Sequence, residues 1–127
     1  YDFSSVPDLA QPVVVTCALR GIPFRFTGLA TLRIKETDRI EALKRELHKL
    51  GFVLRDENGD TLIWDGMRCE PTLEPIDTYD DHRMAMAFAP AAIMFPGLRI
   101  NEPQVVTKSY PQYWADLQKA GFEVKGC

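Results

Sequence analysis

The chain lacks the features of membrane, secreted and nucleic-acid-binding proteins. Its longest apolar run, Met84 to Gly97, is shorter than the roughly 20 residues that span a bilayer. Three cysteines, Cys17, Cys69 and Cys127, are odd in number and widely spaced, so they suggest neither a disulfide framework nor a set of metal ligands. A formal net charge of −3 gives no general attraction for nucleic acid. These absences predict a cytoplasmic protein with no metal, membrane or nucleic-acid partner.

Several catalytic motifs are missing as well. The sequence contains no glycine-rich phosphate loop, no G-x-S-x-G, no C-x-x-C and no H-E-x-x-H. Nothing therefore supports a P-loop nucleotide hydrolase, a serine hydrolase, a dithiol redox protein or a zinc peptidase. What is present is an ordinary composition of 127 residues, 46% hydrophobic and 26% charged, which is enough for one sizeable core.

Hydrophobic periodicity predicts alternating helices and strands. Ile40, Leu43, Leu47 and Leu50 form one apolar helical stripe. The stretches LHKLGFVL (47–54) and LQKAGFEV (117–124) each resemble a helix end, a glycine cap and a strand, which indicates an internal repeat unless the similarity arose by chance. We therefore expect α/β layers, with helices packed against small sheets, in two helix-strand-helix-strand-strand units, 1–66 and 67–127. Besides the helix that ends at Leu50, we expect helices at 8–20, 81–95 and 111–120. We expect strands at 24–26, 61–64 and 98–100. Two more strands are expected directly after Gly51 and after Gly121.

Charged residues gather where these helices should begin. In KETDR (35–39), Glu36 and Asp38 suit an ordinary solvated helix start, but the cations Lys35 and Arg39 are unfavourable there unless they bind an anion. Asp8, after Pro7, is equally suited to a structural role at a helix start. If the two units stack in parallel, these helix starts share one side of the molecule.

The second half adds further charges at the same expected side. Arg83 precedes a helix that is apolar on nearly every face, so its charge needs a partner, either Asp81 or a ligand anion. His82 beside it is not informative alone, and Lys108 gains interest only because it matches Lys35 in the repeat. Together the clusters predict a small-anion site that contains acid and base groups.

The motifs resemble one enzyme family. VPD before an apolar helix, RIKETDRIEAL, YDDHRMAMAF and VVTKSYPQYW occur in the order and spacing found in EPSP synthases, the 3-phosphoshikimate 1-carboxyvinyltransferases, and cover almost the whole chain. The resemblance implies transfer of the enolpyruvyl group of phosphoenolpyruvate to the 5-hydroxyl of shikimate 3-phosphate by addition and elimination, with no cofactor. It further implies that the chain is a partial C-terminal domain, and that an absent N-terminal domain and an absent first unit complete the site.

The resemblance also assigns roles to the charged residues. Asp8 helps to deprotonate the 5-hydroxyl, and Glu36 exchanges a proton with the methylene carbon of phosphoenolpyruvate. Arg39 and Arg83 bind the carboxylate of phosphoenolpyruvate, as planar guanidinium groups do well. The remaining contacts are Lys35 with shikimate 3-phosphate, Lys108 with the phosphate of phosphoenolpyruvate, and His82 in a supporting role.

Departures from the family leave some points open. Thr31 stands where the family often has an asparagine that touches shikimate 3-phosphate, and Pro12 is unusual so close to Asp8. Because half the site is expected elsewhere, we expect the isolated chain to be inactive. The alternatives are a relative that transfers enolpyruvyl to UDP-N-acetylglucosamine and a non-catalytic anion-binding module.

Overall fold

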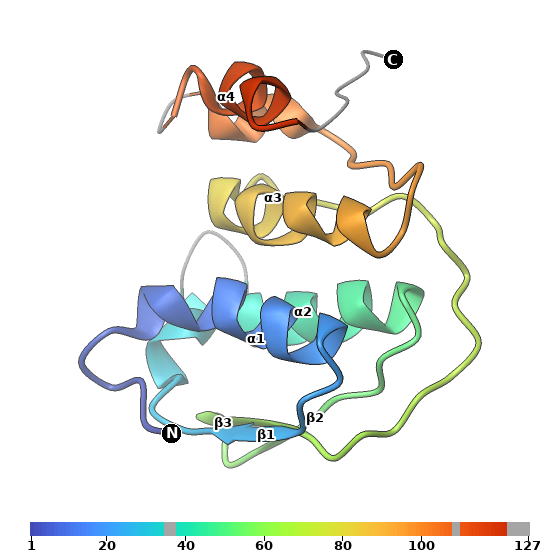
Figure 1. Ribbon diagram of the computed structural model, residues 1–127. Helices are drawn as coiled ribbons and strands as arrows, with labels where there is room; N and C mark the ends of the chain where they lie inside the picture. The colour runs from blue at the N-terminus through green and yellow to red at the C-terminus, as the bar shows by residue number, and fades with distance from the viewer. Residues whose placement is uncertain (35–37, 108–109, 122–127) are drawn as a thin grey trace.

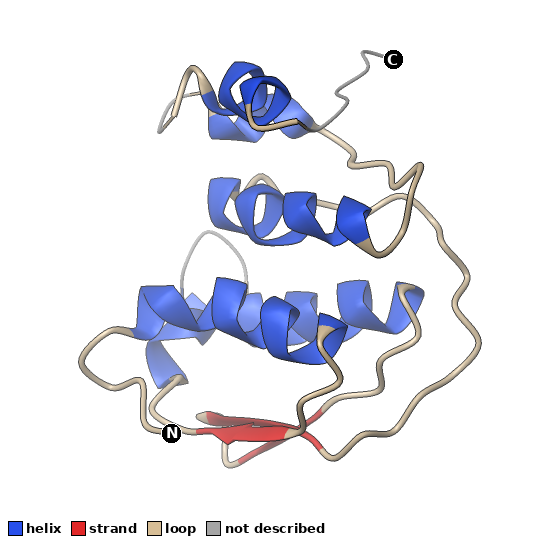
Figure 2. Ribbon diagram, viewed as in Figure 1, coloured by secondary structure: helices blue, strands red, loops and turns tan. Residues whose placement is uncertain are grey.

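The computed structural model describes residues 1–34, 38–107 and 110–121, and its helices lie in layers over one face of a small sheet (Figures 1 and 2). The sheet contains β1 (Phe24–Phe26), β2 (Arg55–Glu57) and β3 (Thr61–Trp64) in the antiparallel order β1-β3-β2. The arrangement is a mixed α/β fold, as the sequence predicts. Within the described part, no helix is both long and apolar enough to cross a membrane.

The sheet forms where aromatic and β-branched residues cluster. Phe24 pairs with Trp64 in the register, and the rings of Phe24 and Phe26 stack at 4.6 Å. Asn58 and Gly59, with φ of 56° and 72°, adopt the left-handed conformation that a tight hairpin turn requires between β2 and β3. The predicted strands 24–26 and 61–64 are confirmed.

Two helices cover the sheet directly. α1 (Ala10–Leu19) follows a short 3₁₀ turn, η1 (Pro7–Leu9), so the expected helix at 8–20 becomes regular only at Ala10. Pro12 is the third residue of α1, where its missing N–H breaks no helical hydrogen bond. α2 (Arg39–Lys49) is capped by Asp38, which accepts the N–H of Glu41 at 3.3 Å. Its predicted apolar stripe is confirmed, because these side chains are fully buried: Ile40, Leu43, Leu47 and Leu50.

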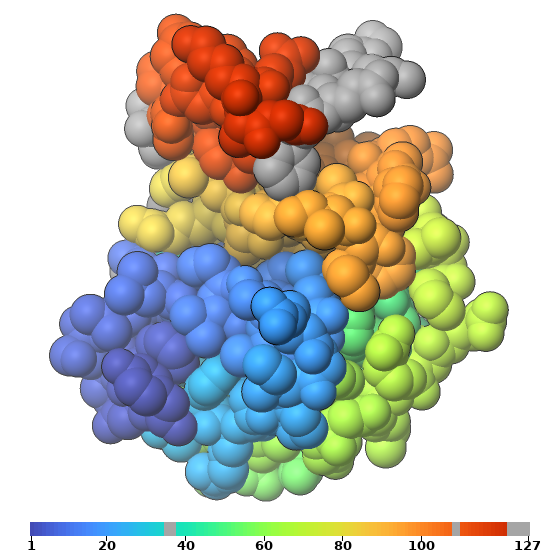
Figure 3. Space-filling model, viewed as in Figure 1, coloured from blue at the N-terminus to red at the C-terminus, as the bar shows by residue number. Residues whose placement is uncertain are grey.

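Two further helices stack above this layer (Figures 1 and 3). α3 (His82–Phe88) changes into the 3₁₀ turn η3 (Ala89–Ile93) at Pro90, so the regular part of the helix expected over 81–95 ends at Phe88. α4 (Tyr113–Lys119) follows the 3₁₀ turn η4 (Pro103–Val106) and packs on α3 through a small second core.

The strand expected at 98–100 is reduced to a single bridge. Ile76 and Ile100 pair in parallel, and the Ile76 N–H donates to the Arg99 carbonyl at 2.8 Å. A strand is stable only where neighbours continue its hydrogen-bond ladder, and the ladder here ends after one residue pair. The strand expected after Gly121 lies outside the described residues.

Candidate active site

α1, α2 and α3 all begin on the same side of the molecule, the left in Figure 1. Arg39, the first residue of α2, has only 2% of its side chain exposed. Its Nε donates to Asp81 Oδ2 at 2.6 Å and its Nη2 to Asp81 Oδ1 at 3.1 Å. Asp81 is itself fully buried. Such a two-point pair compensates both charges where water cannot do so.

Asp81 also fixes the start of α3. Its Oδ1 accepts the backbone N–H of Arg83 at 2.9 Å, which makes it the N-cap of the helix. The sequence suggested Asp81 as a partner of the Arg83 side chain, but the structure pairs it with Arg39 instead. One carboxylate therefore connects the starts of α2 and α3.

Asp8 completes the group from the side of α1. Its Oδ1 lies 3.3 Å from Arg39 Nη1, and its Oδ2 lies 3.8 Å from Arg83 Nη2. The Asp8 and Arg83 side chains are each 41% exposed, so this part of the group faces solvent. We call these four residues the arginine–aspartate cluster: Asp8, Arg39, Asp81 and Arg83.

A pocket of about 190 Å³ opens beside the exposed half of the cluster. Asp8 and Arg83 line it together with Pro12. Tyr113 of α4 also lines it, and its hydroxyl donates to the Met86 carbonyl at 3.3 Å. The pocket combines one carboxylate and one guanidinium with an apolar wall, an arrangement suited to a small anionic molecule.

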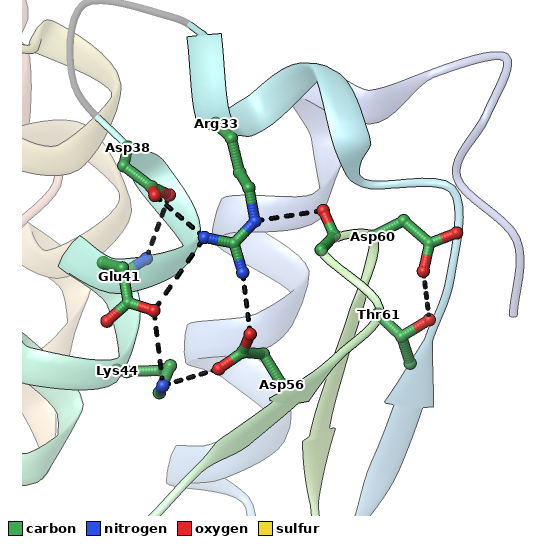
Figure 4. Close-up of polar contacts among 8 residues, drawn as sticks. Arg33, Asp38, Glu41, Lys44, Asp56, Asp60 and Thr61 are labelled. Carbon is green, nitrogen blue, oxygen red and sulfur yellow. Dashed lines mark hydrogen bonds and ion pairs between the residues drawn. The ribbon is translucent and has the colours of Figure 1, made fainter.

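An ion-pair network joins η2 (Ala30–Ile34), the start of α2 and β2 (Figure 4). Arg33 of η2 donates to Asp38 Oδ2 at 2.8 Å and to Asp56 Oδ2 at 2.7 Å. Its Nε reaches the Gly59 carbonyl at 3.0 Å, and Lys44 adds a 2.6 Å contact to Asp56 Oδ1. The hydrogen bond of Lys44 holds the pKa of the Asp56 carboxyl below its usual value, with the two cations adding to the effect.

The structure therefore gathers part of the predicted site. It brings the side chains of Asp8, Arg39 and Arg83 together. Thr31 is exposed on η2, and His82 is half-buried at the start of α3, so their roles stay predictions. Lys35, Glu36 and Lys108 lie outside the described residues.

Glu46 is a buried charge that sequence reasoning missed. It lies on the apolar stripe of α2, three residues after Leu43 and four before Leu50, and is 1% exposed. A carboxylate on an apolar helical face is a signal that a buried partner exists. The partners of Glu46 include the Lys49 ammonium, 2.7 Å from Oε1, and the hydroxyl of Tyr79, which donates to Oε2 at 2.5 Å.

The fold and the cluster define an α/β protein that gathers charged side chains at the starts of stacked helices. Comparison with known protein families identifies the family within this class to which the chain belongs. The family model of EPSP synthase (3-phosphoshikimate 1-carboxyvinyltransferase) matches residues 1–117, and the chain belongs to this family.

Its relatives carry the same description. The 3-phosphoshikimate 1-carboxyvinyltransferase of Bacteroides fragilis is 66% identical over 125 residues, which are 98% of this chain and 30% of that protein. The enzyme of Cellvibrio japonicus is 44% identical over 116 residues, 89% of this chain and 26% of that protein. The enzyme of Pseudomonas syringae pv. syringae is 41% identical over 130 residues, which cover 98% of this chain and 30% of that protein. The chain thus spans less than a third of the length of these relatives.

Proposed function

We propose that the chain is part of a cytoplasmic 3-phosphoshikimate 1-carboxyvinyltransferase. The enzyme transfers the enolpyruvyl group of phosphoenolpyruvate to the 5-hydroxyl of shikimate 3-phosphate and releases phosphate. The observation that carries this proposal is the convergence of Asp8, Arg39 and Arg83 in a chain of the EPSP synthase family. Each comes from a different helix start, so their meeting depends on the fold.

In the proposed mechanism, the carboxylate of phosphoenolpyruvate replaces that of Asp8. Asp8 now lies against the guanidinium groups of both arginines, the position that a ligand carboxylate would occupy. Arg39 keeps its two hydrogen bonds to Asp81, so the incoming carboxylate meets its Nη1 and the Nη2 of Arg83. The released Asp8 is then able to accept the proton of the 5-hydroxyl.

The remaining steps are assigned to residues outside the described part. Glu36 donates a proton to the methylene carbon while the 5-oxygen bonds to the central carbon, which gives a tetrahedral intermediate. Glu36 then removes a proton from the new methyl group as the carbon–oxygen bond to phosphate breaks, and the double bond forms again. Lys35 and Lys108 bind the two substrates as the resemblance implies.

The proposal treats residues 1–66 and 67–127 as two repeated units of one domain. The first unit has the expected order, α1-β1-α2-β2-β3. Because the relatives are more than three times longer than this chain, the rest of the substrate contacts are assigned to the remainder of the enzyme. An isolated half-site cannot hold two substrates in reacting geometry.

The test is a chimeric enzyme in which this chain replaces the matching 30% of the Bacteroides fragilis relative. We expect it to release phosphate from phosphoenolpyruvate only when shikimate 3-phosphate is present, and we expect the chain alone to release none. A folded chimera that releases no phosphate would contradict the proposal. Release that depends on UDP-N-acetylglucosamine would instead identify the other acceptor. A Glu36→Gln chimera with undiminished release would contradict the role of Glu36.

A further inference from the structure

The residues just before α3 have a second connection to α2, apart from the cluster. Glu46 lies two helical turns after Arg39 on the same helix, and its carboxylate is 1% exposed. Its Oε2 accepts the hydroxyl of Tyr79 at 2.5 Å, and its Oε1 accepts the backbone N–H of Asp77 at 2.9 Å. The Lys49 ammonium lies 2.7 Å from Oε1 and balances the buried charge.

The backbone at this place adopts a costly conformation. Tyr79 and Asp80 have φ of 57° and 55°, which is the left-handed region for two successive residues that are not glycine. The turn delivers Asp81 to the start of α3, with the Asp81 N–H donating to the Thr78 carbonyl at 2.8 Å. A turn of this kind persists only where its surroundings hold it.

We propose that Glu46 and Tyr79 are positioning residues for the arginine–aspartate cluster. Their hydrogen bond holds the left-handed turn at 79–80, and the turn places Asp81 where it meets Arg39. The inference rests on the proposed function, because it assumes that Arg39 and Arg83 bind the carboxylate of phosphoenolpyruvate.

The geometry of α2 makes this positioning effective. Arg39 and Glu46 belong to one continuous helix, so the segment 77–81 is attached to that helix at two separated points. Lys49 adds a third attachment through Asp77 Oδ2 at 3.1 Å. Without the Tyr79 hydroxyl, Asp81 would keep its pair with Arg39 but lose the support of the turn that presents it.

The test compares two variants of the chimeric enzyme. Tyr79→Phe removes one hydroxyl and keeps the ring. Ile63→Val removes one methylene from the buried centre of β3, far from the cluster in the fold, and serves as the control for general loss of stability. We expect Tyr79→Phe to raise the KM for phosphoenolpyruvate about three- to tenfold, the effect of one lost hydrogen bond. The KM for shikimate 3-phosphate should change less than twofold, and Ile63→Val should change neither.

Two results would overturn the inference. One is a KM for phosphoenolpyruvate in Tyr79→Phe within twofold of the parent chimera. The other is an equal rise in Ile63→Val, which would make the effect one of general stability.

Amide hydrogen exchange separates this inference from the proposed function. If the parent chimera releases no phosphate, the proposed function fails but the positioning remains measurable. The amides of Asp77, Asp81 and Arg83 should then exchange at least about threefold faster in Tyr79→Phe, while amides of β3 keep their rates. Unchanged exchange at all three amides would overturn the positioning itself.

Discussion

Arg39 and Asp81 meet by two hydrogen bonds, of 2.6 and 3.1 Å, between the first residue of α2 and the residue that caps α3. Both side chains are almost completely buried. The pair therefore does two things at once. It fixes the relative position of two helices, and it aims the remaining Nη1 of Arg39 toward Asp8 and the open side of the cluster.

Removal of Asp81 should destabilise the chain strongly. Asp81→Ala leaves a buried guanidinium without its main partner and removes the cap of α3, so we expect the free energy of unfolding to fall by about 3–5 kcal/mol. Urea unfolding followed by circular dichroism measures the change. The control is Glu70→Ala, an exposed carboxylate for which the loss should stay below about 0.5 kcal/mol. Equal losses in the two variants would show that the pair contributes little.

Neutralising Asp8 should have opposite effects on binding and turnover. In the chimeric enzyme, Asp8→Asn removes the proposed base, and we expect phosphate release to slow about 100-fold or more. The same change removes the negative charge that competes with phosphoenolpyruvate for Arg39 and Arg83. Its dissociation constant should therefore fall about two- to fivefold, which is the range for a part-exposed ion pair. Calorimetric titration measures this constant, and weaker binding by Asp8→Asn would contradict the competition.

Tyr79 should make stability fall at alkaline pH. Burial, and then its hydrogen bond to Glu46, raise the pKa of Tyr79 from 10.0 to about 12 in the folded chain. Because the folded pKa is the higher one, this stabilisation is complete below pH 10 and is lost as the pH rises through 12. Tyr79→Phe should lose less stability than the parent between pH 10 and 12.

Absorbance of tyrosinate provides the direct measurement. Subtracting the titration of Tyr79→Phe from that of the parent should leave one ionisation near pH 12. The matched control is Tyr1→Phe, which changes a tyrosine that is 74% exposed. A difference curve centred near pH 10 for Tyr79 would contradict its half-buried, hydrogen-bonded state.

Gly28 should be far less replaceable than Gly21. Both have positive φ, 74° and 70°, so alanine carries a similar conformational cost of about 1 kcal/mol at each. A Cβ at residue 28 would overlap Asp2 Oδ1 and the backbone nitrogen of Ser4, whereas nothing lies within 4 Å at residue 21. We expect Gly28→Ala to lower the free energy of unfolding by about 1–3 kcal/mol more than Gly21→Ala. Parallel thermal unfolding of the two variants checks this, and equal midpoints would contradict the close packing.

Local sequence signals predicted much of the first half of the fold. The expected strands 24–26 and 61–64 are both present, because their aromatic and β-branched residues favour extended backbone whatever their partner. The apolar stripe of α2 was equally local. The strand expected at 98–100 is not formed, although its partner is nearer in sequence than that of β1. Among the described residues its partner segment provides only the Ile76–Ile100 pair, and one pair does not make a ladder.

The sequence predicted that charged residues at the helix starts lie on one side of the molecule. It did not predict which of these residues form ion pairs with one another. Asp8, Arg39 and Arg83 meet because the helices that carry or follow them begin on the same side of the molecule. Asp81 pairs with Arg39 and not with the side chain of Arg83. This pairing depends on the left-handed turn at 79–80, which places Asp81. Two successive residues with positive φ, neither of them glycine, leave no clear signature in sequence.

The strand order β1-β3-β2 also bears on how quickly the chain folds. β2 and β3 are joined by a short turn, so their hairpin closes on the timescale of microseconds. β1 reaches its place only when Phe24 meets Trp64 across the whole intervening length of α2. Closing that large loop costs conformational entropy before the contacts between β1 and β3 can contribute any stabilising free energy. We therefore expect the docking of β1 onto the preformed β2–β3 hairpin to be the slowest step in forming this sheet.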